Sequence, residues 1–226
     1  MEKKYLLLVL PLLIAALMGA CLLPGRTSSC TIFPVKTKDT ALVGRNFDWS
    51  EKGGRIRFIP SAPSKNSMAL LEQISEDMPF EGMNDKGLFV GMAAVPETEV
   101  PFSLFKTMVK SLELIKIILS HASTVEESLG YFSKYTVLFG ETFGNPLIHY
   151  MVADQSGDSA VIEFFENEVI VIKRTKGYQL MTNHYLTDPQ YGSISASSKN
   201  RFEIVKAGLD SRGMSNLEGK DIVSIL

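Results

Sequence analysis

The sequence predicts an α+β domain in which antiparallel sheets are covered by helices. Short runs of β-branched and apolar residues alternate with turn residues as far as Ala94. Between Ser103 and Tyr135 the apolar residues recur at spacings of three and four, which is typical of amphipathic helices. Alternation returns from Leu147, and one more helical pattern begins near Asn200. Elements grouped in this order favour an α+β domain over a Rossmann fold.

Residues 1–29 have the layout of an export leader. Two lysines precede the uncharged apolar stretch Tyr5–Leu23, and a polar exit ends at the small residue Ser29. A signal peptide cut after Ser29 is one prediction. The nineteen apolar residues nearly span a bilayer, so an uncleaved membrane anchor stays open. A loose lipobox at Leu17–Cys21 is a third option, with a lipid on Cys21.

In each case we expect an exported protein, either secreted, periplasmic or attached to the outer face of the cell membrane. Contact with a membrane is expected only through the leader or a lipid on Cys21. Residues 30–226 then form one domain, and the apolar run Ile222–Leu226 favours a chain that continues beyond it.

Charge and cysteine content narrow the classes of function. Removing residues 1–29 takes three of the 23 basic residues and one of the 25 acidic residues, which leaves 20 and 24 and a net charge of −4. A mildly acidic surface argues against nucleic acid as a partner. The same cut leaves Cys30 as the one cysteine, so no internal disulfide can form.

The first half of the domain is predicted to be mainly strand. Thr31–Val35 and Thr40–Gly44 flank a turn-rich link, so they predict a hairpin that starts at Cys30. Further strands are predicted at Arg55–Ile59, Met68–Ile74 and Leu88–Ala94, with a turn at Gly82–Gly87.

Helices and a meander are predicted to follow. An amphipathic helix is predicted from Ser103 onward, and Thr124 with Glu127 fits the capping box of a second helix that ends near Tyr135. The later predicted elements are the strands Leu147–Ala153, Ser159–Phe165, Glu168–Lys173 and Tyr178–Thr182, and a helix at Asn200–Gly208.

Cys30 is the candidate nucleophile. At a chain terminus it carries a thiol with a reference pKa of about 8.5 and an α-amine of about 7.7 to 8.0, so the amine can accept the thiol proton. Such a site needs no histidine, no metal and no cofactor. A lone cysteine is also often a small buried apolar residue, and that alternative stays open.

Arg45 and Asp48 follow Cys30 on the next predicted strand. An isolated Arg-x-x-Asp is commonly a surface ion pair. Beside a terminal cysteine, however, the carboxylate can bind the ammonium and the guanidinium can lower the pKa of the thiol. The combination favours an active site.

With these residues in place, the chain resembles the choloylglycine hydrolases, which include bile salt hydrolases and penicillin V acylases, among the N-terminal-nucleophile (Ntn) hydrolases. The resemblance covers most of the chain after residue 29. The motifs that carry it, in family order, are Cys30-Thr31, Gly44-Arg45-Asn46-Phe47-Asp48-Trp49, Asn84-Asp85-Lys86-Gly87-Leu88, Met181-Thr182-Asn183 and Ser197-Ser198-Lys199-Asn200-Arg201-Phe202.

The resemblance implies an αββα layered domain and a role for each matching residue. Cys30 would be the nucleophile, with Arg45 and Asp48 tuning and orienting it. Asn183 would donate to the oxyanion, and Arg201 would complete the polar cluster. An amide donor at a tetrahedral oxyanion is typically worth about 3 to 4 kcal/mol.

The sequence departs from the family pattern at two places, which limits what the resemblance implies about the substrate and the oligomeric state. The family position that holds Asn in bile salt hydrolases and Tyr in penicillin acylases falls on Ala94, which can offer only its backbone N–H to the oxyanion. The segment between Asn183 and Arg201 is shorter than in bile salt hydrolases, where a hairpin helps to hold a tetramer. We therefore do not expect that tetramer, while another homo-oligomer stays open.

Apolar residues near the expected site, among them Met83, Phe139 and Tyr185, favour a small-molecule substrate with an apolar acyl part. Two hypotheses follow. The first is an exported amidohydrolase that cleaves a linear non-peptide amide of an acyl-conjugated small molecule. The alternative is a membrane-tethered binding protein with an Ntn-like fold, in which Cys30 is inert.

Overall fold

The computed structural model describes residues 29–48, 53–72, 78–140, 146–191, 196–214 and 217–226. The predicted leader and Trp49 lie outside these residues. No helix within the described ranges is long and apolar enough to cross a membrane.

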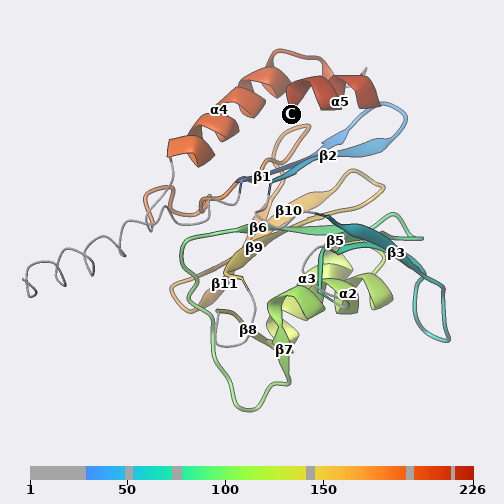
Figure 1. Ribbon diagram of the computed structural model, residues 1–226, viewed down its shortest axis with the longest axis vertical. Coiled ribbons are helices and arrows are strands. Elements are labelled where there is room, and N and C mark those ends of the chain that lie inside the picture. The colour runs from blue at the N-terminus through green and yellow to red at the C-terminus, as the bar shows by residue number, and fades with distance from the viewer. Residues whose placement is uncertain (1–28, 49–52, 73–77, 141–145, 192–195, 215–216) are drawn as a thin grey trace, which may run out of the picture.

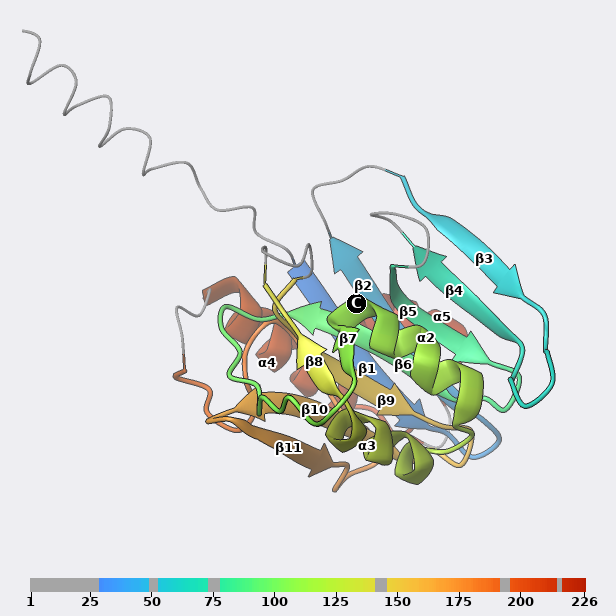
Figure 2. The same cartoon turned by 90° about the horizontal axis from the view of Figure 1, so that it is seen from below.

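The described residues form layers in the order helix, sheet, sheet, helix (Figure 1). The outer helices and the smaller sheet are α4 (Ala196–Asp210), α5 (Gly219–Ile225), β1 (Ser29–Lys36) and β2 (Ala41–Asp48). On the opposite side, α2 (Ser111–His121) and α3 (Val125–Lys134) cover the larger sheet (Figure 2). This arrangement confirms the predicted α+β class.

The larger sheet has seven antiparallel strands in the order β11-β10-β9-β6-β5-β4-β3. Their bounds are β3 (Arg55–Ile59), β4 (Met68–Glu72), β5 (Pro79–Asn84), β6 (Phe89–Ala94), β9 (Ile148–Ala153), β10 (Ser159–Phe165) and β11 (Glu168–Lys173). The meander of β9, β10 and β11 is confirmed. The predicted strand at 68–74 ends at Glu72, and its last two residues lie outside the described ranges.

Strand β5 was not predicted, because Pro79 and Gly82 interrupt its apolar pattern. The position has no room for a larger residue: a Cβ at Gly82 would lie 2.7 Å from the backbone oxygen of Ala69 on β4 and 2.8 Å from the Leu119 side chain of α2. A residue that reads as a turn signal in the sequence therefore allows a helix to approach the sheet closely.

Strands β1 and β2 form the predicted hairpin. Alternate residues of β1 face opposite layers: Cys30 and Ile32 pack towards the seven-stranded sheet, whereas Phe33 and Val35 pack among residues of α4 and α5. The predicted strand at 178–182 pairs with β1 only through isolated bridges, including one between Ile32 and Met181. Because β1 is packed on both faces, the positions of this strand and of Cys30 are fixed by the surrounding core.

The helix predicted from Ser103 is wrong in its first eight residues, since α2 starts at Ser111. Met108–Lys110 instead form β7, which pairs in parallel with β8 (Thr136–Leu138). The hydroxyl of Thr136 also donates to the backbone oxygen of Ser103 at 2.9 Å. Pairing with a segment about thirty residues away therefore overrides the helical spacing of this stretch.

The two other predicted helices are present. Thr124 caps α3 by accepting a hydrogen bond from the backbone N–H of Glu127, as predicted. The Glu127 carboxylate accepts from the backbone N–H of Ser123 rather than from that of Thr124, so the second bond of the predicted capping box is not formed. The helix predicted at Asn200–Gly208 extends in both directions to become α4, and α5 was not predicted.

Candidate active site

Cys30 is the second residue of β1, and its side chain is fully buried. Its backbone nitrogen donates to Oδ1 of Asn183 at 2.7 Å. The two residues are far apart in sequence but adjacent in space, because the segment before Asn183 bridges to β1. The hydrogen bond joins the predicted nucleophile to the predicted oxyanion residue.

Asn183 is held by polar contacts on both sides. Its Oδ1 also accepts from Nη2 of Arg201 at 2.9 Å, and its Nδ2 donates to the backbone oxygen of Ala94 at 2.8 Å. An amide nitrogen carries two hydrogens, so one remains for a substrate oxygen. The structure thus brings Cys30, Ala94, Asn183 and Arg201 together, while the oxyanion role of Asn183 stays a prediction.

Ala94 also lies where the sequence placed it, at the end of β6. Val95 donates to the oxygen of Leu147 in the neighbouring chain segment. Backbone groups alternate in direction along an antiparallel pair, so the N–H and C=O of Ala94 point away from β9. Its C=O already accepts from Asn183, and its N–H is on the same side.

Arg201, on the second turn of α4, binds the backbone of the predicted nucleophile Cys30. Its Nη1 donates to the backbone oxygen of Cys30 and, at 3.1 Å, to the hydroxyl of Thr31. Burial lowers the pKa of Arg201 below its usual value, although attraction to Cys30 and Asp48 opposes that shift. A charged group normally unfavourable near a helix start is therefore stabilised here by its partners.

Asp48 lies at the end of β2, directly across from Ser29. Its side chain is exposed, and its charge acts on Arg201. It is therefore one residue removed from Cys30 across the hairpin.

Arg45 lies between the two sheets. Among the described residues it has no hydrogen bond with Cys30. Its Nε lies 2.6 Å from Oε2 of Glu81 on β5, and its Nη2 donates to the backbone oxygen of Met92 at 3.0 Å. The guanidinium also lies over the ring of Phe47, the cross-strand neighbour of Cys30. Burial raises the pKa of Glu81, and the charge of Arg45 opposes that rise. Glu81 was not predicted, because the strand on which it lies, β5, was not predicted either.

Replacing Glu81 by alanine should strongly destabilise the protein. The change leaves the guanidinium of Arg45 buried without its counter-charge, which typically costs about 3 to 5 kcal/mol. Denaturant unfolding would measure the loss. Glu126→Ala is the matched control, because the Glu126–Lys173 pair is largely exposed and should be worth below about 1 kcal/mol. Equal losses in both variants would contradict the assignment of Arg45 and Glu81 as a buried structural pair.

The three predicted apolar residues do not gather around Cys30. Met83 is opposite Phe89, at the far end of β6 from Ala94, and lines a cavity of about 260 Å³ beside the hairpin turn. Phe139 packs against Phe164 on the side of α2 and α3.

Tyr185 is fully buried, and its hydroxyl donates to the backbone oxygens of Glu97 and Phe164. In this structure Tyr185 therefore belongs to the core, and its place in a substrate pocket stays a prediction. Single-residue apolarity cannot distinguish the core from a pocket wall.

Metal-binding groups are not apparent in the described part of the chain. No set of three or more His, Cys, Asp or Glu residues there could hold a metal ion.

Comparison with known proteins agrees with this geometry. A model of the family described as linear amide C–N hydrolases, choloylglycine hydrolase family, matches residues 30–207. Penicillin V acylase from Pectobacterium atrosepticum is 28% identical over 169 residues, which are 70% of this chain and 42% of that protein. The chain therefore spans less than half the length of this curated relative.

Solved structures with the same arrangement include two hydrolases of this kind. A mutant of the conjugated bile acid hydrolase from Clostridium perfringens matches with a TM-score of 0.64 and 20% identity, over 87% of this chain and 78% of that one. Penicillin V acylase from Agrobacterium tumefaciens matches with the same TM-score and identity, over 87% and 71%. These likenesses show the Ntn-hydrolase fold, and the family match shows that the chain belongs to the choloylglycine hydrolase family.

Proposed function

We propose that this protein is an exported amidohydrolase that cleaves a linear, non-peptide amide of an acyl-conjugated small molecule, with Cys30 as an N-terminal nucleophile. The hydrogen bond from the Cys30 nitrogen to Asn183 is the observation that carries the proposal. Removal of residues 1–29 would turn this same nitrogen into a free α-amine. Its acceptor is already in place, so maturation requires no rearrangement of Asn183.

Surrounding charges support a reactive terminus. The guanidinium of Arg201 contacts the backbone oxygen of Cys30, which puts a cation beside the proposed nucleophile. Asp48 is opposite Ser29, so its carboxylate would be close to the ammonium that forms at Cys30. The family match begins at residue 30, which agrees with a functional chain that starts there.

The proposed reaction proceeds through an acyl-enzyme. The free amine of Cys30 takes the thiol proton as Sγ attacks the amide carbon, which gives a tetrahedral oxyanion. Asn183 Nδ2–H and the N–H of Ala94 are the proposed donors to that oxyanion. The C–N bond then breaks while the ammonium returns the proton to the leaving amine.

Hydrolysis completes the cycle. Water attacks the thioester as the amine accepts one of its protons, the C–S bond breaks, and the sulfur is protonated again. The acyl group leaves as a carboxylic acid. Every group that handles a proton in this scheme is on Cys30 itself, which explains why no histidine needs to contact the sulfur.

The class of substrate is proposed from the relatives. Those proteins are named for penicillin V and conjugated bile acid, both of which contain an acyl group in amide linkage. A panel of penicillin V, a conjugated bile salt, a fatty acyl ethanolamide and an acyl homoserine lactone would test the class. Release of the free amine is the readout.

Hydrolysis should depend on a free α-amine at residue 30. N-terminal sequencing and intact mass of the secreted protein should give a chain that starts at Cys30. A version that retains Ser29 should lose nearly all activity, because an amide nitrogen has no lone pair available to accept the thiol proton. Full activity with Ser29 in place would refute the mechanism, and an intact leader on an inactive protein would favour the membrane-tethered binding protein.

A further inference from the structure

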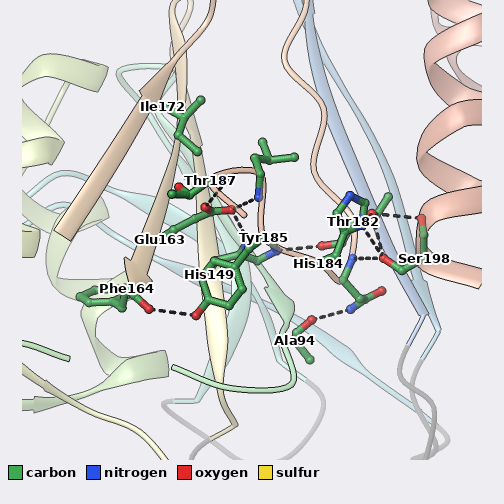
Figure 3. A network of polar contacts seen from close by, with 12 residues as sticks. Ala94, His149, Glu163, Phe164, Ile172, Thr182, His184, Tyr185, Thr187 and Ser198 are labelled. Atoms are coloured by element: carbon green, nitrogen blue, oxygen red, sulfur yellow. Dashed lines mark hydrogen bonds and ion pairs between the residues drawn. The ribbon is translucent and has the colours of Figure 1, made fainter. Parts of the chain in front are cut away.

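Residues 182–187, which contain Asn183, have no regular pairing with a strand. Their backbone groups are instead held by buried side chains of β9 and β10 (Figure 3). Irregular backbone in a protein interior needs such partners, since an unpaired buried polar group is costly. The contacts on either side of Asn183 therefore decide where its side chain lies.

His149, on β9, holds the side before Asn183. Its Nε2 lies 2.8 Å from the backbone oxygen of Thr182, and its Nδ1 lies 3.4 Å from Oε1 of Glu163. The backbone oxygen of Thr182 can only accept, so Nε2 donates this hydrogen bond, while Nδ1 faces the carboxyl group of Glu163. The side chains of His149 and Glu163 are both fully buried.

Glu163, on β10, holds the side after Asn183. Its Oε1 accepts from the backbone N–H of Leu186 at 2.6 Å, and its Oε2 accepts from that of Thr187 at 2.9 Å. Burial alone would raise the pKa of Glu163, but the hydrogen bond and charge of His149 and the donors of Leu186 and Thr187 hold that pKa below its usual value. The carboxylate is therefore ionised and anchors two consecutive residues.

Ser198, on α4, fixes Asn183 directly. Its hydroxyl accepts from the backbone N–H of Asn183 at 2.9 Å and lies 2.9 Å from Nδ1 of His184. Burial, with the charge of His149, lowers the pKa of His184 to about 4, so its neutral ring can accept the serine proton. The chain of donors thus runs from Asn183 through Ser198 to His184.

We propose that Glu163 and His149 are positioning residues that hold Asn183 against the nucleophile. This inference rests on the proposed function. Neither side chain has a described hydrogen bond with Cys30, and both act through the segment that they anchor at Thr182, Leu186 and Thr187. Asn183 lies between these anchors. If they were lost, residues 182–187 could shift and the 2.7 Å contact between Asn183 Oδ1 and the Cys30 nitrogen would lengthen.

Glu163→Gln tests the proposal in the secreted, processed protein. The glutamine keeps the volume of the side chain, but it removes the charge and turns one acceptor into a donor facing a backbone N–H. We expect kcat to fall by about 10- to 100-fold with KM within about threefold of wild type, since displacement by about 1 Å can cost about 10²-fold. Hydrogen exchange at Leu186 and Thr187 should speed up at least about tenfold.

The matched control is Glu168→Gln, which makes the same change at an exposed position on the neighbouring strand β11. It should leave kcat and exchange at residues 182–187 unchanged. His149→Gln is the second variant if Glu163→Gln does not fold, because it loses the contact with Glu163 while offering an amide to the oxygen of Thr182. It should show the same loss of kcat and the same faster exchange.

The measurements separate this inference from the proposed function. Hydrogen exchange tests the anchoring whether or not any substrate of the panel is cleaved. A wild-type protein that cleaves nothing would overturn the function, whereas unchanged exchange in Glu163→Gln or His149→Gln would overturn the anchoring. An active wild type and a variant with faster exchange but full kcat would overturn the positioning role.

Discussion

Replacing Cys30 by alanine is expected to reduce amide hydrolysis by at least about 10³-fold. The change removes the nucleophile but leaves the α-amine, Asn183 and Arg201 in place, and substrate binding with oxyanion stabilisation alone gives little turnover. The side chain is small and buried, so the variant should still fold. Release of the amine from the best substrate of the panel is the measurement, on protein whose N-terminus at residue 30 has been verified by mass spectrometry.

Cys21→Ser is the matched control for Cys30→Ala. Cys21 lies in the predicted leader, so an enzyme that starts at Cys30 should not contain it, and its replacement should leave the specific activity unchanged. Cys30→Ser adds a graded comparison, because a hydroxyl is a weaker nucleophile than a thiol and should retain only a small part of the rate. Near-normal hydrolysis by Cys30→Ala would exclude covalent catalysis at this residue.

Asn183→Ala is the second change expected to have a large effect, with a fall in kcat of about 10² to 10³-fold. Loss of one oxyanion donor is typically of this size. Here the same side chain also joins the Cys30 nitrogen to Arg201, so the variant loses both the acceptor and the donor. The measurement is kcat and KM on the best substrate, together with thermal unfolding.

Asn183→Asp separates the two roles of this amide. It keeps the oxygen that faces Cys30 and Arg201. In place of Nδ2, which lies 2.8 Å from the backbone oxygen of Ala94, it puts a second oxygen that cannot donate to Ala94. Activity should fall as far as in Asn183→Ala if donation matters most. Asn200→Ala, an exposed position on α4, should leave kcat within twofold, and an equal loss there would show that the effect is not specific to Asn183.

Much of the strand content could be predicted because it depends on local patterns. The hairpin at Cys30, strand β3 and the meander of β9 to β11 have alternating apolar residues and clear turn signals, and the structure agrees with them. The start of α2 and the existence of β5 could not be predicted in this way. Met108–Lys110 form a strand because they pair with β8. Gly82 is typical of a turn in the sequence, but in the structure it lies within β5, where α2 packs against it.

The site was predicted in part and for a different reason. Cys30, Arg45 and Asp48 were chosen for the chemistry of their side chains, and the family resemblance added Asn183 and Arg201. Hydrogen bonds link Cys30, Asn183 and Arg201. Glu81, Glu163 and His149 could not be found this way. A lone buried carboxylate or histidine leaves no local signal, because its partner is on another strand.

The sequence by itself determined the layered α+β class, the position of Cys30 at the start of a strand and the order of the motifs, because each depends on neighbouring residues. Only the tertiary structure decided that Asn183 reaches the Cys30 nitrogen, that Arg45 pairs with Glu81 and that Tyr185 is buried core. Contacts between residues far apart in the chain follow from sheet register and layer packing, and no local pattern of residues specifies these.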